Sequence, residues 1–493
     1  MQTKKDVKKS GFDYAALVSS RILKIIIAVI SVPIITRILG PEGYGRLNLF
    51  YMIGSLGMTF LISWLVMPTV RFGKEEFVKT GRLNKVFWSL NLMMVLGLLI
   101  GVVVYLIFRN KINSYIGIED GKVIIYLIIY FLLIALSEYM NRIFIATGKI
   151  DKSAVLEVLP KALLLIPLIY FFIKGKVEVL TLIILALTTQ GLALIISTKW
   201  FKAKLIRPLK IDTGLTKNMF IFAYPFFFSA TASYIVQYID LIVIKKYMPV
   251  ADVGIYSLSY NIAAHLKQLV AAASIVMTPI IIGLYAEKRK DLLKDYVRIF
   301  IPQGIFLWSV VLCGFLIAIP FIMPVFFEES FSRSIIPVQI LLCGLLVNGI
   351  RGFYSGILTA FKLSKIIMVV IIVIAFVNLL GDVVLVPLIG INGAALSSAI
   401  AFSIGGVGYM YFGGQSLQLK EFKALAFILP VIFVYIIMVN GLYYALPFVI
   451  IIYYFMLRAL KIFKKGDVYI LNFIKLPDNL DKLFRWIYNK LGV

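Results

Sequence analysis

The chain has 493 residues, of which 61% are hydrophobic, and a mean hydropathy of +0.98. Soluble globular domains do not reach this apolarity, so lipid must be the solvent for most of the chain. The two cysteines, Cys313 and Cys343, lie in apolar segments, and there is a single histidine. We therefore expect no disulfide framework, no metal site and no cofactor.

Apolar stretches of about 20 residues, the length that spans a bilayer as a helix, recur along the whole chain. They predict fourteen membrane helices, centred near residues 26, 58, 96, 134, 163, 187, 231, 268, 311, 347, 375, 401, 431 and 450. The first follows a basic segment that resembles the start of a signal peptide. Because its apolar run is long and ends in no small-residue cleavage site, we expect an uncleaved span.

The predicted loops are all short. None has room for a soluble domain, which argues against membrane glycosyltransferases and polysaccharide polymerases. We therefore predict an all-α polytopic membrane protein that is not an enzyme.

Basic residues are distributed unevenly between the two sides of this predicted membrane map. Of the 50 Lys and Arg residues, 34 lie on the side of the N-terminus, 10 on the opposite side and 6 within the spans. The richest segments are 71–85, 199–217 and 288–298. Basic loops stay in the cytoplasm, so we predict a multi-pass protein of the cytoplasmic (inner) membrane with both termini cytoplasmic. This distribution also explains the net charge of +26 without a nucleic-acid partner.

An internal repeat divides the chain. Residues 37–47 follow the first predicted span and 246–256 follow the seventh, and each segment holds a basic residue, a Gly or Pro, an acidic residue and a further Gly. Because six spans separate the copies, both have the same orientation, which predicts two bundles that rock against each other. We place six-helix bundles at 1–205 and 213–412, two additional transmembrane helices at 421–462 and a cytoplasmic amphipathic tail at 467–493.

The tail has two interpretations. Asp478 is a candidate helix cap, and apolar residues from Leu480 to Leu491 recur on one helical face. Such a helix can lie on the inner leaflet or pack against the protein's own helices.

Three segments resemble one family. Arg37-Ile38-Leu39-Gly40-Pro41-Glu42-Gly43-Tyr44-Gly45 resembles the first-loop signature of polysaccharide transporters of the Wzx type. Tyr238-Ile239-Asp240 with 253–257, and the segment 385–395, are similar to later parts of the same pattern. These transporters share the MOP superfamily with the multidrug and toxin extrusion (MATE) antiporters and the lipid II flippase MurJ.

The resemblance implies a MATE-like arrangement and a flippase without covalent chemistry. Its cargo would be a polyprenyl-pyrophosphate-linked oligosaccharide, moved by alternating access for O-antigen or exopolysaccharide biosynthesis. The implied partners are this lipid-linked anionic glycan, membrane lipid and other polysaccharide-assembly proteins. Two alternatives stay open, a MATE-like ion-coupled small-molecule exporter and a lipid II flippase.

Six basic residues lie within predicted spans, where an uncompensated charge is unfavourable. They are Arg21, Lys24, Arg142, Lys161, Lys267 and Arg351. We predict that they bind the anionic substrate, because Arg pairs bidentately with phosphate and Lys acts as a point charge. Their excess argues against a cavity for cationic drugs.

Each of these assignments has an alternative. Arg21 and Lys24 share one helical face, and the alternative for them is snorkelling to the nearby interface. At i,i+4 spacing, local ion pairs are the favoured interpretation of Glu138–Arg142 and Glu157–Lys161. Arg351 has no acidic residue at helical spacing, which favours an anion contact.

Polar residues predict a second function for the cavity, the binding of a coupling ion, either sodium or a proton. The candidates are Asp240, Asp382, Glu138, Gln237, Asn261 and His265. Asp240 continues a polar stripe through Gln237, and Asn378 and Asp382 lie at i,i+4. The alternatives are a structural pairing of Asp240 with a nearby lysine and a hydrogen-bonded, pore-lining His265.

Overall fold

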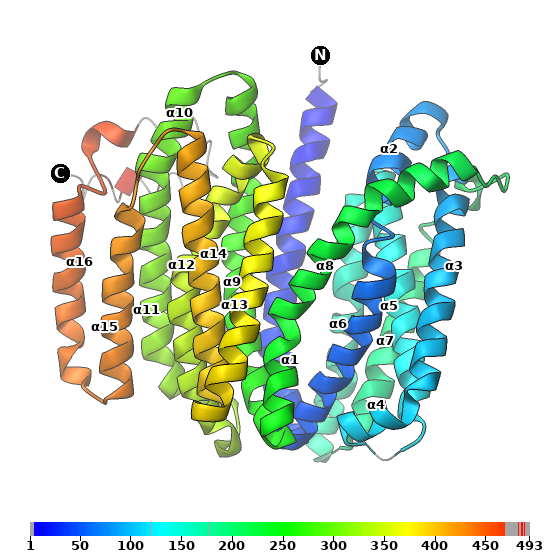
Figure 1. Ribbon diagram of the computed structural model, residues 1–493, viewed down its shortest axis with the longest axis horizontal. Coiled ribbons are helices and arrows are strands. Elements are labelled where there is room, and N and C mark those ends of the chain that lie inside the picture. Colours follow the sequence, from blue (N-terminus) through cyan, green and yellow to red (C-terminus); the bar gives the residue numbers. More distant parts are fainter. Residues whose placement is uncertain are drawn as a thin grey trace. The chain divides into compact units, whose positions relative to one another are not determined.

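The structure is a computed structural model that describes residues 4–118, 120–175, 177–468, 482, 485, 486 and 488, without the side chains of 4–18, 203, 272, 275, 276 and 465. Within these residues every regular element is a helix (Figure 1). In this part of the chain, 11 helices are long and apolar enough to cross a membrane. The chain is therefore a multi-pass membrane protein. Every predicted span centre falls within a helix, but the predicted count of fourteen is not confirmed.

Two compact units make up the chain, and each is described separately. The first comprises Met1–Leu241 and Pro249–Gly254, and the second comprises Ile242–Met248 and Ile255–Val493. The first unit contains α1 (Lys4–Met58), α2 (Pro68–Thr80), α3 (Asn84–Ile107), α4 (Arg109–Ile116), α5 (Val123–Ala146), α6 (Ile150–Lys174), α7 (Val179–Thr198) and most of α8 (Thr213–Tyr247). The second contains most of α9 (Val250–Ala286), then α10 (Lys290–Asp295), α11 (Ile301–Phe326), α12 (Ile335–Ala360), α13 (Ser364–Ile389), α14 (Ile391–Ser416), α15 (Ile428–Val439) and α16 (Leu446–Leu460). The predicted bundles at 1–205 and 213–412 stay a prediction.

The first two predicted spans belong to one long helix with a sharp break. Gly40 has φ 64° and ψ 179°, a backbone conformation that favours glycine, and Pro41 follows it. Proline has no N–H to continue the helix before it, yet it is well suited to begin the next one. The chain therefore passes between the two spans through this break rather than through an extended loop at 37–47.

The two copies of the internal repeat approach each other within the first unit. A Cβ atom added to Gly45 would meet the carbonyl oxygen of Val250, and one added to Gly254 would meet the carbonyl oxygen of Pro41. Residues 45 and 254, like 41 and 250, are equivalent in the repeat. The contact is therefore reciprocal, and at both positions only glycine leaves room for the opposite backbone.

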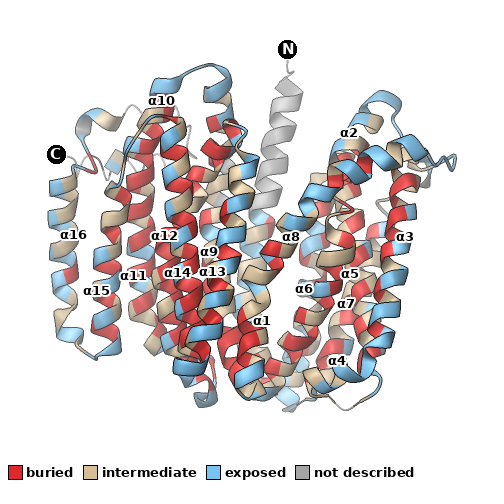
Figure 2. Cartoon of the chain, viewed as in Figure 1, coloured by how far each residue is buried: buried red, intermediate tan, exposed pale blue. Residues whose placement is uncertain are grey.

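The core of the second unit lies between α12 and α14, which are largely buried (Figure 2). Small residues bring these helices together. A Cβ atom on Gly344 would lie 2.5 Å from the Cα atom of Ala399, and one on Gly406 would meet the backbone of Val347. Close backbone approach of this kind stabilises helix pairs in lipid, where apolar burial alone gives little driving force.

Most of the predicted tail at 467–493 lies outside the described residues. Tyr488 is described, and it is buried. Its hydroxyl oxygen accepts a hydrogen bond of 2.7 Å from Nε2 of Gln303 on α11, and its ring meets Phe463 edge-on. At this position the structure favours packing against the protein's own helices over the membrane surface.

Candidate functional site

The basic residues of the first unit gather around one carboxylate between α1 and α6. Nζ of Lys24 lies 2.5 Å from Oε2 of Glu157, and Nδ2 of Asn141 on α5 donates to Oε1 of the same carboxylate at 3.0 Å. Lys24 from the neighbouring helix is the direct partner of Glu157, while Lys161, the partner predicted at i,i+4, is attracted by the charge of the same carboxylate. The i,i+4 spacing identifies ion-pair partners on the same helix only, so it could not identify Lys24.

Two further cations surround this ion pair. Arg21 contributes an attractive charge at Glu157, and Lys24 repels the ammonium of Lys161. Lys161 is exposed although it lies inside an apolar helix. Three cations therefore share one acid, and the group formed by Arg21, Lys24, Glu157 and Lys161, which we call the α1–α6 cluster, keeps a net charge of +2.

A separate ion pair lies on α5. Glu138 and Arg142 are 3.2 Å apart, which confirms their predicted i,i+4 pairing. The hydroxyl of Ser63, in a π-helical turn at Thr59–Ser63, donates to the other carboxylate oxygen at 3.1 Å. Nε of Arg142 is buried and has no hydrogen-bond partner within the described residues. The pair is neutral overall, yet it retains one guanidinium donor for a ligand.

The two cations within the spans of the second unit, Lys267 and Arg351, lack such acids. Nζ of Lys267 on α9 lies 4.8 Å from the ring centroid of Phe402, and Cζ of Arg351 on α12 lies 5.3 Å from that of Tyr409. Both rings belong to α14. In the part of the chain that the structure describes, no carboxylate lies within 4.0 Å of either cation. A cation–π contact contributes only about 0.5–2 kcal/mol, so these charges keep most of their attraction for an anion.

An amide donor lies beside Arg351. Asn348 is one helical turn earlier on α12 and only 6% exposed, and its Nδ2 donates to no acceptor among the described residues. Leaving a buried donor unpaired is unfavourable. Lys267 and Arg351 are close enough for their charges to repel each other. With Asn348 they form what we call the α9–α12 site.

His265 is hydrogen-bonded, as one of its two interpretations predicted. Nδ1 of His265 and Nε2 of Gln268 are 3.3 Å apart on α9, and Asn261 is half-buried on the same predicted face. These residues lie on the same helix as Lys267.

The two candidate coupling acids are both buried. Asp240 is 1% exposed, whereas Gln237 and Ser233 earlier on α8 are exposed, so the predicted stripe ends in a packed region. Asp382 is 0% exposed on α13, where the neighbouring Asn378 donates to Oγ of Ser397 at 3.2 Å. The predicted role of both acids in ion coupling stays a prediction. Among the described residues, no group of three or more His, Cys, Asp or Glu residues could hold a metal ion.

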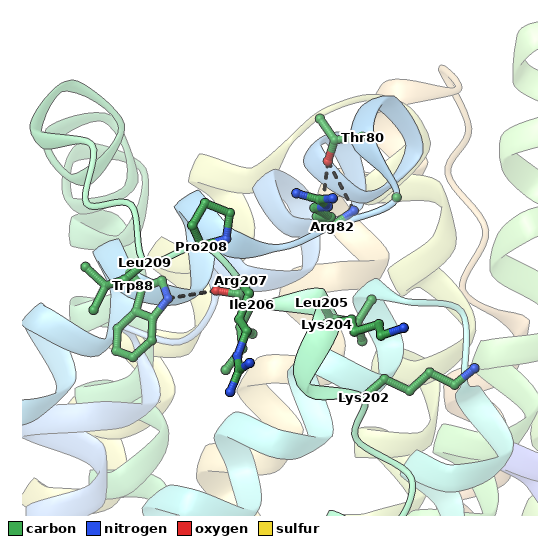
Figure 3. A pocket seen from close by; sticks show the side chains of 11 residues that line it. Thr80, Arg82, Trp88, Lys202, Lys204, Leu205, Ile206, Arg207, Pro208 and Leu209 are labelled. Atoms are coloured by element: carbon green, nitrogen blue, oxygen red, sulfur yellow. Dashed lines mark hydrogen bonds between the residues drawn. The ribbon is translucent and has the colours of Figure 1, made fainter.

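A basic pocket lies at the ends of the first unit's helices. It has a volume of about 800 Å³ and lies between the α2–α3 turn and the segment that follows α7 (Figure 3). The lining residues are Thr80, Gly81, Arg82, Trp88, Lys202, Lys204, Leu205, Ile206, Arg207, Pro208 and Leu209. We call it the linker pocket. From the sequence, these basic residues indicate only the orientation of the chain, because nothing local shows that two distant segments meet.

Comparisons with known proteins agree with this fold. A model of the family described as polysaccharide biosynthesis protein matches residues 13–285, which is more than half of the chain. No curated protein sequence matches. The structure of the lipid II flippase MurJ in an inward closed conformation is similar over 88% of this chain and 99% of that chain, with 17% identity and a TM-score of 0.64.

Two transporters of the MOP superfamily are similar as well. An inward-facing multidrug resistance MATE family transporter matches over 82% of this chain and 98% of its own, with 13% identity and a TM-score of 0.66. A transporter from Pyrococcus furiosus matches over 82% and 95%, with 14% identity and a TM-score of 0.58. At these identities the likeness establishes the fold, which is the one that the sequence resemblance implied.

Proposed function

We propose that the chain, which belongs to the polysaccharide biosynthesis protein family, is a flippase for a polyprenyl-pyrophosphate-linked oligosaccharide. The observation that carries this proposal is the α9–α12 site, where Lys267 and Arg351 lie within apolar helices and no carboxylate of a described residue lies within 4.0 Å of either cation. Both residues are half-buried, and a charge within the hydrocarbon region is unfavourable unless something compensates it. An anionic headgroup supplies that compensation when it binds.

The chemistry of the two charged regions suits a pyrophosphate. The guanidinium of Arg351 can bind two phosphate oxygens at once, while Lys267 adds a point charge and Asn348 a neutral donor. The α1–α6 cluster contributes a second region with a net charge of +2. In a flippase, such regions would hold the headgroup while the lipid tail stays in the membrane.

Alternating access between the two sides of the cytoplasmic membrane is the mechanism we propose, with both termini in the cytoplasm. No bond of the cargo is made or broken. The buried Asp240 and Asp382 are the candidate sites for a coupling sodium ion or proton. One elementary charge moved across 100 mV is worth about 2.3 kcal/mol, enough to bias the return of the carrier.

The cargo discriminates this proposal from its alternatives. A MATE-like exporter of cationic compounds would need an acidic cavity, and the cations of both units oppose that. For the Pyrococcus furiosus transporter, a reversed polarity of the binding pocket suggests a different function, so pocket polarity varies on this fold. A lipid II flippase would share the headgroup chemistry and differ in the sugar.

The test is transport in proteoliposomes. Fluorescent lipids would carry the same oligosaccharide on a pyrophosphate or on an uncharged linker, and a quencher that cannot cross the membrane would report translocation. We expect the pyrophosphate lipid to be moved and the uncharged lipid not. Equal rates for both lipids would refute the anion site, transport of lipid II alone would identify the second alternative, and uptake of a cationic dye alone the first.

A further inference from the structure

The walls of the linker pocket come from two segments that are fixed to each other. The backbone N–H of Leu83 donates to the carbonyl of Leu205 at 2.7 Å, and Nε1 of Trp88 donates to the carbonyl of Ile206 at 2.9 Å (Figure 3). Further along, Nδ2 of Asn84 reaches the carbonyl of Pro208 at 3.3 Å. The segment that follows α7 is thus hydrogen-bonded to the start of α3, and the pocket is formed before any ligand arrives.

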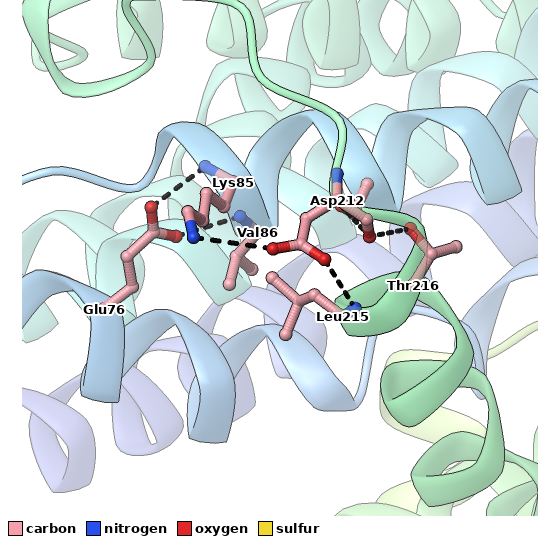
Figure 4. Close-up of polar contacts among 7 residues, drawn as sticks. Glu76, Lys85, Val86, Asp212, Leu215 and Thr216 are labelled. Atoms are coloured by element: carbon pink, nitrogen blue, oxygen red, sulfur yellow. Dashed lines mark hydrogen bonds and ion pairs between the residues drawn. The ribbon is translucent and has the colours of Figure 1, made fainter.

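Two carboxylates stabilise the starts of α3 and α8 next to the linker pocket (Figure 4). Glu76 on α2 accepts from the backbone N–H groups of Lys85 and Val86, both at 2.9 Å, and so caps the first turn of α3. Asp212 accepts from the backbone N–H of Leu215 at 3.0 Å and pairs with Nζ of Lys85 at 3.4 Å. Both acids are occupied by these structural contacts, and neither lines the pocket.

The lining is strongly basic. Arg82, Lys202, Lys204 and Arg207 are all exposed, and no acidic residue belongs to the lining. The positive charge also acts on Lys149 outside the lining, where burial and then the charge of Lys202 hold the pKa of the ammonium below its usual value. Four cationic side chains around the linker pocket create a positive electrostatic potential that attracts anions.

The pocket lies beside the ends of candidate membrane spans, where the headgroups of a bilayer are expected. Three candidate membrane spans have an end beside it, since α3 begins at Asn84, α7 ends at Thr198 and α8 begins at Thr213. Apolar groups accompany the cations: Leu209 is 63% exposed, and the indole of Trp88 forms part of the wall. Exposed apolar side chains, an indole and basic residues together are typical of a membrane interface.

We propose that the linker pocket binds the phosphate headgroup of an anionic membrane lipid. The phosphate would lie among the four cations, and the lipid tails would extend beside Leu209 toward the bilayer. A soluble segment would not need exposed apolar residues next to its basic groups. The linker pocket shares no residue with the two charged regions assigned to the transported headgroup, so this proposal goes beyond the proposed function.

The test measures lipid binding and not transport. The detergent-purified full chain would be titrated with phosphatidylglycerol or phosphatidylcholine, and bound lipid would be counted by native mass spectrometry. We expect a preference for phosphatidylglycerol. A cation near a charged lipid contributes roughly a fivefold effect, so Arg82→Gln/Arg207→Gln and Lys202→Gln/Lys204→Gln should each weaken phosphatidylglycerol binding about twentyfold.

A matched variant controls for the loss of charge alone. Lys362 and Lys365 are exposed, lie outside the pocket and belong to the same predicted cytoplasmic side. Lys362→Gln/Lys365→Gln should change binding less than twofold. Equal weakening in the control and pocket variants would overturn the proposal. Elution volume and melting temperature would show that each double variant is folded, and because two separate pairs are tested, misfolding of one leaves the other as the test.

Competing anions identify the source of the phosphate. A tenfold excess of inorganic pyrophosphate should not displace phosphatidylglycerol, and displacement would mean that the pocket serves a soluble anion. Polyprenyl pyrophosphate should bind no better than phosphatidylglycerol in the pocket, as judged by the same variants. A clear preference for it would overturn the assignment to a membrane lipid and make the pocket part of the transport route.

Discussion

In the first unit the ammonium of Lys24 lies 2.5 Å from the carboxylate of Glu157, whereas in the second unit Lys267 and Arg351 lie over the rings of Phe402 and Tyr409. Both regions keep an excess of two positive charges. The first reaches this excess with acids interspersed among its cations, and the second reaches it without a carboxylate within 4.0 Å among the described residues.

The two units thus maintain positive charge within their spans in two different ways. An acid beside a cation stabilises the free protein, but it competes with a ligand for the same ammonium. An aromatic ring stabilises a cation less and carries no net charge, so it leaves the cation available. We therefore infer that the second unit binds the anionic headgroup more strongly than the first.

The largest effect is expected in the second unit. Lys267→Ala/Arg351→Ala removes the two cations of the α9–α12 site. Hydrogen bonds to charged groups contribute about 1.5–3 kcal/mol each, so headgroup affinity and transport should fall by roughly two orders of magnitude or more. The measurement is binding of polyprenyl pyrophosphate to the purified protein together with transport in proteoliposomes.

Two variants make this result specific. Arg351→Lys keeps the charge but loses the bidentate geometry, and should give an intermediate loss. Lys365→Ala removes an exposed cation elsewhere in the second unit and should leave affinity unchanged. A double variant that transports like the wild type would show that the α9–α12 site does not hold the cargo.

In the first unit, one substitution is expected to increase the affinity for the headgroup. Glu157→Gln removes the acid that occupies Lys24, so headgroup affinity should rise by roughly three- to tenfold. The free energy of unfolding should fall by less than about 1 kcal/mol, because Glu157 is 38% exposed and solvent screens the pair.

The control for this variant is Glu75→Gln, an exposed acid on α2 outside the cluster. It should change neither affinity nor stability. Weaker binding by Glu157→Gln would mean that the ion pair positions Lys24 for the ligand, and the contrast between the two units would then disappear.

A smaller effect concerns the buried acids, one in each unit. If Asp240 and Asp382 bind the coupling ion, Asp240→Asn and Asp382→Asn should each reduce the dependence of transport on an external sodium or proton gradient by a factor of about two to five. Headgroup affinity measured without a gradient should change less. A double variant with the wild-type gradient dependence would place coupling elsewhere or show that substrate supply alone drives transport.

The smallest effect concerns the acids that stabilise the first unit outside the membrane. The backbone N–H of Leu215, followed by the neighbouring Lys85, holds the pKa of Asp212 below its usual value. A group with a lowered pKa stabilises the folded state above its unfolded pKa of about 3.9 and loses this effect as the pH falls through the folded value.

Asp212→Asn should therefore lower the melting temperature slightly at pH 7 and have a smaller effect near pH 3. Melting in detergent at the two pH values provides the measurement, with Glu75→Gln as the control. A difference that persists unchanged at pH 3 would mean that the amide itself disturbs the start of α8, and that the carboxylate charge is not what stabilises it.

The ion pairs show where sequence reasoning succeeds and where it stops. Glu138 and Arg142 lie one turn apart on the same helix, so their spacing predicted the pair that the structure has. Glu157 has a partner at the same spacing, Lys161, but the structure pairs it with Lys24, 133 residues earlier. Helical periodicity places residues on a face, and it does not say which other helix that face meets.

The linker pocket and the repeat contact illustrate the same limit. Arg82 and Arg207 both line the linker pocket only because the segment after α7 is hydrogen-bonded to the start of α3. Gly45 and Gly254 were recognised as parts of a repeat, yet their reciprocal contact could not be foreseen from it. Contacts between distant segments depend on how helices cross.

Local features of the sequence are sufficient to identify the class of this protein. Apolar stretches long enough for a bilayer, basic loops on one side and a short resemblance around Gly40 and Pro41 sufficed for a polytopic transporter fold, because transfer to lipid and helix breaking depend on local composition. Which cations are neutralised depends instead on how the helices pack. A charge is compensated by whatever side chain lies within a few ångströms, and for Lys24 and Arg351 that neighbour is set by the packing of helices far apart in the chain.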